Sequence, residues 1–302
     1  ISHMQSLKEY ATRKIKDVLN KLPNGQVKAI EYLDDDTPLA VTIDIQGSFI
    51  TFNFSGSGAV HKANLNATPA IVNSVVIYVL RLLLDESIPL NDGLMETVNI
   101  IIPEGLLNPP FNKSPDKCPA VVGGNIEISQ RLTDTILKAF NIVACSQGTM
   151  NNVLFGNENF GYYETIAGGS GAGKDFDGAS GVHQHMTNTR ITDPEILEHR
   201  YPVRLDEFSI RQKSGGKGNR TGGNGVIRKF TFLDKVELSL LAQHRKYAPY
   251  GLKGGEDGKK GIQYVIRSSG EKIELSGMSH CVINKNDQFI IETPGGGGYE
   301  KV

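Results

Sequence analysis

Two histidines one residue apart, His183 and His185, lie in the stretch of this chain that is richest in groups able to do chemistry. If this stretch is a strand, both imidazoles point to the same side, because side chains alternate with a period of two. Such a pair can bind zinc, manganese or iron, with a third ligand from Glu164, Asp177 or Glu198. Alternatively, one histidine acts as a general base or donates a hydrogen bond to a carbonyl substrate, or both belong to a structural network.

Amide and guanidinium donors accompany the histidines. Asn188 and Arg190 follow them directly and suit carboxylate or imide oxygens, unless this segment is a solvated loop. Further upstream, Asn125 comes after a glycine pair at a helix start, which can hold an anion or bring helix and strand close together. Asn151 ends a run of small and amide residues whose composition suits the wall of a site.

A glycine-rich run precedes the histidines and nearly matches the phosphate-loop pattern. Residues 168–175 read GGSGAGKD, and Asp175 stands where the pattern needs a serine or threonine hydroxyl to coordinate magnesium. A carboxylate at that position would oppose phosphate charge. The sequence therefore disfavours nucleotide binding here.

A cysteine and a serine, Cys145 and Ser146, are the nucleophiles nearest to this region. No base stands close to them in the sequence, and no G-x-S-x-G elbow surrounds the serine. We therefore do not assign either one a nucleophilic role.

The whole composition limits the classes of partner. The net charge of the 302-residue chain is −1 and its charges are interspersed, which argues against nucleic acid and anionic lipid as partners. The three cysteines (Cys118, Cys145 and Cys281) lie far apart, and no run of 18 apolar residues occurs. We expect a cytoplasmic protein with free thiols and no membrane partner.

Hydrophobic periodicity predicts an α+β fold. The first four residues, ISHM, are typical of a cloning scar and are left out of the fold. We expect a mixed α/β lobe over residues 5–202, with antiparallel strands, two buried helices and the HxH segment. Residues 203–302 are expected to form an all-β lobe, sandwich or barrel-like, divided by glycine loops. The predicted helices cover residues 6–22, 70–84 and 127–140, and the first strands cover 27–33, 39–46, 49–54 and 98–102.

Several motifs together resemble the hydantoinase B/oxoprolinase family. They appear in the expected order from about residue 64 onward, and HxHMTNTR and the terminal TPGGGG are highly specific. The runs are VVGGNIEISQRLTD (121–134), ACSQGTMNN (144–152), YYETIAGGSGAG (162–173), DGASGVHQHMTNTRITDPEILEHRYPV (177–203), SGGKGNRTGGNGVIR (214–228) and ETPGGGGY (292–299).

The resemblance implies the hydrolytic component of an ATP-dependent enzyme that opens a cyclic imide or lactam. A partner of the hydantoinase A type would hold ATP and magnesium and activate the ring carbonyl by phosphorylation. Members look roughly twice as long, and their N-terminal motifs have no counterpart here, so this chain resembles the C-terminal half of such a subunit. The resemblance places a divalent metal in the other half, and no cofactor in this one. It also implies an oligomer.

With this function in view, we assign expected roles to individual residues. Acid/base roles are predicted for Glu164 and His183, and substrate contacts for His185, Asn188, Arg190, Asn125 and Asn151. No metal ligand is predicted in this chain, the alternative being His183 with His185. Two other functions stay open: a fragment of a related ATP-dependent ketone carboxylase of the acetone or acetophenone type, and a non-catalytic assembly module of either enzyme.

Overall fold

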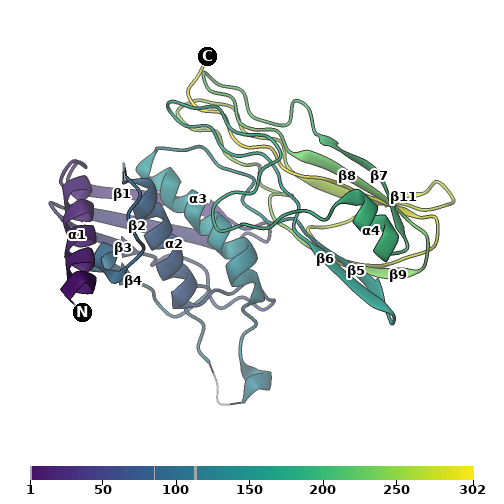
Figure 1. Ribbon diagram of the computed structural model, residues 1–302, viewed down its shortest axis with the longest axis horizontal. Helices are drawn as coiled ribbons and strands as arrows, with labels where there is room; N and C mark the ends of the chain where they lie inside the picture. The colour runs from purple at the N-terminus through teal and green to yellow at the C-terminus, as the bar shows by residue number, and fades with distance from the viewer. Residues whose placement is uncertain (1, 85, 112–113) are drawn as a thin grey trace. The chain divides into compact units, whose positions relative to one another are not determined.

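The computed structural model describes residues 2–84, 86–111 and 114–302 (Figure 1). Residue 1 of the expected cloning scar lies outside the described residues. The chain divides into two compact units, residues 1–140 and 141–302. The sequence placed the boundary after residue 202 instead. Strands β5 and β6, which precede residue 202, hydrogen-bond into a sheet with later strands, and this pairing draws residues 141–202 into the second unit.

The first unit is built on a four-stranded sheet. Its order is β1-β2-β3-β4, antiparallel except for the parallel pair β3 and β4. Alternate residues of β2 are buried, as the sequence pattern predicts for a sheet with one covered face. The strands are β1 (Gly25–Tyr32), β2 (Pro38–Gln46), β3 (Phe49–Asn53) and β4 (Val98–Ile101).

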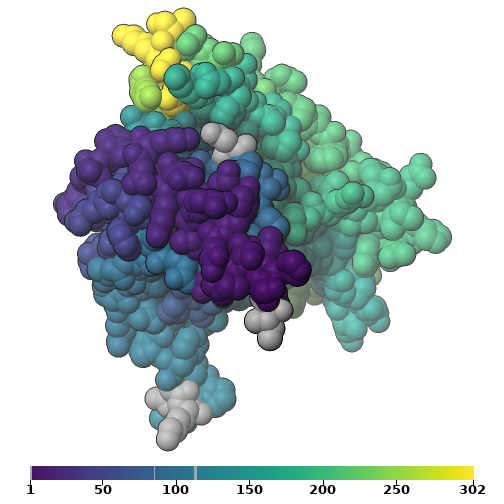
Figure 2. Space-filling view, turned by 60° about the vertical axis from the view of Figure 1, so that its left-hand side comes forward, coloured from purple at the N-terminus to yellow at the C-terminus, as the bar shows by residue number. Residues whose placement is uncertain are grey.

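Helices cover the buried face of this sheet (Figure 1). Helix α3 contacts β1 and β2, and α2 packs against α3. Figure 2 shows α1, in the darkest purple, at the surface. It begins at Ser2 and so includes three residues of the expected cloning scar. The helical elements are α1 (Ser2–Leu19), α2 (Pro69–Leu82), α3 (Ser129–Phe140), the short turns η1 (Asp92–Met95) and η2 (Pro115–Lys117), and the π-helical η3 (Gly124–Ile128).

The two predicted buried helices are buried to different extents. Helix α2 buries one face through Val72, Val76 and Val79, while Leu82 is 51% exposed. Helix α3 buries ten of its twelve residues, among them the charged Arg131. The apolar content of α2 therefore overstated its burial, because a helix at the outside of a layer needs only one apolar stripe.

The second unit contains a β-sandwich with antiparallel pairing throughout (Figure 1). Its core joins aromatic side chains from both sheets, among them Phe155 on one and Phe230 on the other. The lobe predicted as a sandwich or barrel is thus a sandwich, and the described strands form no closed barrel. One sheet is β11 (Lys272–Glu274), β10 (Ile262–Ile266), β13 (Gln288–Glu292), β8 (Val226–Phe232) and β7 (Val203–Ile210); the other is β12 (Met278–Ile283), β9 (Val236–Leu241), β5 (Asn152–Asn157) and β6 (Phe160–Glu164).

Beyond the strand ends, extended segments of the second unit lie side by side and exchange backbone hydrogen bonds. We call residues 144–147, 168–173, 178–181, 214–225, 249–259 and 293–299 the glycine bundle. Its bonds recur every third residue: Gly169 N donates to Pro294 O at 3.0 Å and Ala172 N to Gly297 O at 3.0 Å. Three residues per turn is the repeat of the polyproline II helix.

Glycine is required in this bundle because the chains approach so closely. A Cβ on Gly169 would overlap Gly223 O and lie 2.5 Å from Gly296 N. The four terminal glycines, residues 295–298, lie equally close to backbone atoms of neighbouring segments. The run 214–225, one of the glycine loops, is an integral member of the bundle and is hydrogen-bonded to residues 170, 296 and 299.

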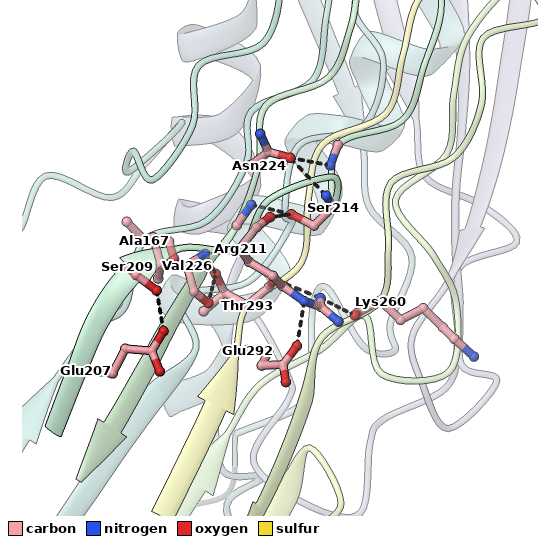
Figure 3. Close-up of polar contacts among 12 residues, drawn as sticks. Ala167, Glu207, Ser209, Arg211, Ser214, Asn224, Val226, Lys260, Glu292 and Thr293 are labelled. Atoms are coloured by element: carbon pink, nitrogen blue, oxygen red, sulfur yellow. Dashed lines mark hydrogen bonds and ion pairs between the residues drawn. The ribbon is translucent and has the colours of Figure 1, made fainter.

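Polar side chains fasten the strands where they enter the bundle (Figure 3). The buried Thr293 hydroxyl donates to Ala167 O and accepts from Val226 N, both at 2.8 Å. Arg211, just after β7, pairs with Glu292 at 2.8 Å. The ends of three strands and the segment after β6 are therefore held together by side chains, and the bundle beyond them by backbone groups.

In the sequence, the short helix α4 (Pro194–Arg200) lies between bundle residues 178–181 and strand β7 of the sandwich. Asp193 caps it by accepting from Glu195 N at 2.9 Å, and Leu197 is buried in the sandwich core. A proline occupies the first helical position, where its fixed φ favours the start of a helix.

Candidate functional site

The HxH segment, residues 182–192, is not a strand. Val182 and Gly168 exchange backbone hydrogen bonds, after which Thr187 N donates to Gln184 O and closes a turn. His185 has a φ of 53°, in the left-handed region that residues with a Cβ rarely adopt. The alternation that would put both imidazoles on one side is therefore absent.

His183 is half-buried. Its Nδ1 atom is buried and has no hydrogen-bond partner among the described residues. Burial lowers the pKa of this imidazole, because a low-dielectric environment disfavours the cation. At neutral pH the ring is accordingly neutral, with one nitrogen able to accept a proton.

The other predicted substrate contacts on this segment differ in exposure. His185 is partly buried, whereas Asn188 and Arg190 are exposed. Asn188 and Arg190 therefore present their donors to solvent. Thr189, the residue between them, attaches the segment to the chain after β6, because its hydroxyl hydrogen-bonds that of Thr165.

Glu164, at the end of β6, is 4% exposed and already engaged. Arg228 donates to its two oxygens, from Nε at 2.8 Å and from Nη2 at 3.0 Å. The Tyr162 hydroxyl donates to Oε2 at 2.7 Å. Three donors hold this buried carboxylate in place, so its geometry suits a fixed acceptor more than a group that exchanges protons.

Asn151 and Asn125 lie in different units. Asn151 is fully buried in the second unit, where Nδ2 donates to Gln147 Oε1 at 2.7 Å and Oδ1 accepts from Arg245 at 2.7 Å. Asn125 is exposed on η3 of the first unit. The residue next to Glu164, Thr165, contacts the HxH segment through Thr189. Asn151 lies in the interior of the second unit.

The near-match to a phosphate loop belongs to the glycine bundle. The backbone N–H groups of Gly168, Gly169, Ser170 and Ala172 all donate to backbone carbonyls, and that of Gly171 donates to Ser146 Oγ. Donors that are occupied in this way cannot cradle a phosphate, which agrees with the argument from Asp175.

A buried thiol–imidazole contact escaped sequence reasoning. Cys145 Sγ lies 3.6 Å from His244 Nε2, and Tyr247 O lies 2.7 Å from Nδ1 of the same ring. The base that seemed to be missing thus stands 99 residues away along the chain. Both side chains are buried, at 0% and 1% exposure, and this pair has no route to solvent that would make it a nucleophile.

The proposed third metal ligands have other partners. Asp177 accepts from Thr221 N at 2.7 Å, and Glu198 accepts from Leu205 N at 2.8 Å. Glu164 is paired with Arg228. Over residues 2–84, 86–111 and 114–302, no three His, Cys, Asp or Glu side chains gather as metal ligands would. Whether this chain takes part in a metal site stays a prediction.

Two further properties concern the chain as a whole. In the described residues no helix combines the length and the apolar character that a membrane span requires. Cys118, Cys145 and Cys281 are free thiols, as expected.

The fold and the motifs define one class of protein: an α+β unit followed by a sandwich whose strands run into a glycine bundle beside an HxH segment. The chain belongs to the hydantoinase B/oxoprolinase family, which it matches over residues 2–301. A 5-oxoprolinase of Dictyostelium discoideum is 44% identical over 308 residues, covering 99% of this chain and 24% of that protein. The chain therefore spans about a quarter of the length of this curated relative.

Solved structures share the fold. The ATP-dependent caprolactamase of Pseudomonas jessenii superimposes with a TM-score of 0.83 at 20% identity, covering 98% of this chain and 55% of that one. An acetone carboxylase in its nucleotide-free form superimposes with a TM-score of 0.82 at 14% identity, covering 96% and 47%. At these identities the likeness concerns the fold alone.

Proposed function

We propose that this chain is the C-terminal part of the hydrolytic B component of an ATP-dependent hydantoinase or 5-oxoprolinase, which opens a cyclic imide or lactam by hydrolysing a C–N bond. The observation that carries the proposal is the family match over residues 2–301, together with 44% identity to a 5-oxoprolinase over 99% of this chain.

His183 is the acid/base group of this proposal. Ring opening needs a base that aims water at the carbonyl and an acid that protonates the leaving nitrogen. A neutral, half-buried imidazole suits the first role, because a neutral ring keeps one nitrogen that can accept a proton. His185, Asn188 and Arg190 supply substrate contacts from the same segment. Asn125 is exposed in the other unit, and the hydrogen bonds of the buried Asn151 support a structural role for it.

ATP and magnesium belong to the partner in this proposal. A subunit or domain of the hydantoinase A type would phosphorylate the carbonyl oxygen of the cyclic substrate and so supply much of the activation of that carbonyl. The divalent metal belongs to the remaining half of the B component, since the carboxylates near the HxH segment are engaged with Arg228, Thr221 N and Leu205 N. We further propose that the complete enzyme is a cytoplasmic hetero-oligomer.

The experiment uses the full-length subunit with its ATP-using partner. Ring opening of 5-oxoproline and of hydantoin is followed by mass spectrometry, with ATP hydrolysis measured in parallel. His183→Gln should lower kcat by about 10²- to 10⁴-fold, the usual contribution of an acid/base group. His280→Gln is the matched control, because His280 is exposed on β12. Normal turnover of His183→Gln would remove this residue from the mechanism.

A ketone carboxylase is the second candidate, because the chain shares its fold with acetone carboxylase. The same preparation, given acetone or acetophenone with bicarbonate and ATP, should form no carboxylated product. Carboxylation without ring opening would establish this alternative. If the His183→Gln and Arg190→Ala variants change oligomer mass and leave both reactions unchanged, the chain is an assembly module.

A further inference from the structure

Buried polar contacts connect the two sheets of the sandwich beneath the HxH segment. Arg228 comes from β8 of one sheet and Glu164 from β6 of the other. Their bidentate ion pair is almost completely buried, with side-chain exposures of 0% and 3%. The guanidinium also lies 4.9 Å from the Phe208 ring and 5.0 Å from the Phe230 ring. Arg228 is therefore held both by charge and by aromatic faces.

Tyr162 extends this ion pair toward the HxH segment. Its hydroxyl donates to Glu164 Oε2 at 2.7 Å, and the Thr192 side chain lies close enough to the same phenol to act on its pKa, in the lowering direction. Burial and the neighbouring Glu164 charge both raise the pKa of Tyr162, so the phenol keeps its proton and remains a donor. The Glu164 carboxylate thus fixes the orientation of the group that contacts Thr192.

The HxH segment has further attachments to the chain that follows β6. Val182 pairs with Gly168 at its start, and Gln184 Nε2 donates to Gly168 O at 3.4 Å. Near its end, Thr189 hydrogen-bonds Thr165, the residue next to Glu164. His183 lies between the first two of these attachments, and its ring is not held by any side-chain partner among the described residues.

The energetics of burial indicate what such an ion pair provides. A buried pair contributes little net stability, because desolvation offsets the charge attraction, but it accepts only a narrow geometry. Across two sheets, that geometry fixes β6 relative to β8 and aims the Tyr162 hydroxyl.

We propose that Arg228, Glu164 and Tyr162 form a positioning relay that holds residues 182–192, and with them His183, in the geometry that ring opening requires. Glu164 acts through Tyr162 and exchanges no proton with substrate. The effect of the relay on turnover rests on the proposed function, whereas its effect on the segment is a property of this chain.

The first test measures the segment directly. Amide hydrogen exchange of residues 182–192 is compared between the wild-type chain, Tyr162→Phe and Glu164→Gln. Tyr163→Phe is the control, because its neighbouring hydroxyl donates to Asn152 at 2.6 Å and not to the relay. Both relay variants should exchange at least about tenfold faster in this segment, with the glycine bundle unchanged. Unchanged exchange in Tyr162→Phe, the milder variant that keeps the ion pair, overturns the relay even if Glu164→Gln fails to fold.

The second test measures turnover of the full-length complex against pH. A misplaced acid/base group costs up to about 100-fold in kcat, so Tyr162→Phe and Glu164→Gln should both lower kcat with KM and the shape of the pH profile retained. Loss of the acid limb in Glu164→Gln, with segment exchange unchanged, would make Glu164 itself the base and overturn the relay. If the wild-type complex opens no ring, the proposed function fails while the exchange data still decide the relay.

Discussion

The sandwich and the glycine bundle belong to the same unit and are held together by opposite means. In the sandwich, aromatic side chains such as Phe155, Phe230 and Phe289 fill the space between two sheets. In the bundle, hydrogen bonds run directly from backbone to backbone, and glycines leave no room for side chains between the chains. The sandwich is stabilised by side chains that fill its interior, whereas the bundle requires residues without a Cβ at its closest contacts.

This difference predicts opposite responses to mutation. Removing atoms should damage the sandwich, because a cavity forfeits both hydrophobic transfer and dispersion contacts. Adding atoms should damage the bundle, because its chains cannot separate without breaking their hydrogen bonds. The predictions below run from the largest expected effect to the smallest.

Truncation in the sandwich has the largest expected effect. Phe230 is fully buried, and its ring lies 6.0 Å from that of Phe155 and 6.3 Å from that of Phe289. Phe230→Ala should lower the free energy of unfolding by about 3–5 kcal/mol, the usual cost of a large aromatic cavity. Urea unfolding followed by circular dichroism measures it. A loss below about 1 kcal/mol would show that the sandwich is not organised around this aromatic contact.

A single added methyl group tests the bundle. Gly169→Ala should cost about 1–3 kcal/mol, because its Cβ meets backbone atoms of residues 223 and 296, which cannot rotate away. Gly161→Ala is the control: this glycine lies in β6, and a Cβ there meets nothing within 4 Å. Thermal unfolding of both variants checks the comparison. Equal stability of the two would mean that the bundle chains can move apart, contrary to the structure.

Acid should destabilise the sandwich more than the bundle, although the effect is smaller than that of the two mutations. Burial acts to raise the pKa of Asp287, and hydrogen bonds from Arg267 at 2.7 Å and from the backbone N–H of Asn284 and of Ser268, both at 2.9 Å, outweigh it and lower the pKa overall. Since the folded pKa lies below the unfolded one, this stabilisation is complete above the unfolded pKa and disappears as pH falls through the folded pKa.

Asp287→Asn measures that contribution. The variant should lose about 1 kcal/mol at pH 7, and the gap to wild type should close as the pH falls below 4. The bundle amides that donate to backbone carbonyls have no titrating partner, so their protection factors should follow global unfolding only; the amides of Thr221 and Gly251, which donate to Asp177 and Asp257, are left out of this comparison. A gap independent of pH would show that the carboxylate charge contributes nothing to this end of the sandwich.

Elements with a regular side-chain period were predictable from the sequence. The strands near residues 27–54, the three helices predicted before residue 141 and the sandwich all follow from alternation or a 3.6-residue repeat. The bundle was not predictable, because its chains differ in sequence from sandwich loops only in glycine content, and glycine has no side chain whose period could be read. Its position within the second unit depends on pairings between segments more than a hundred residues apart, such as Gly169 with Pro294.

The sequence indicated which residues could belong to the site, but not which of them contact one another. The sequence grouped Glu164 and His183 in one site, which stays a prediction, and the structure places the segments that carry them next to each other. It gave no sign that Arg228, 64 residues further on, would occupy the Glu164 carboxylate. A pair formed across two sheets leaves no local spacing signal, so the acid/base role predicted for Glu164 lacked the information that now favours positioning.

The close packing of the bundle has a consequence for the gene. Every glycine codon begins with two guanines, and any change in either base encodes a residue with a Cβ or a stop. At Gly169, Gly223 and Gly296 each of these residues meets neighbouring backbone atoms. A phenylalanine codon in the sandwich, by contrast, can become leucine or isoleucine in one step and keep an apolar core. The codons of these close-packed glycines are therefore free to drift only at their third positions, while the sandwich can exchange its side chains.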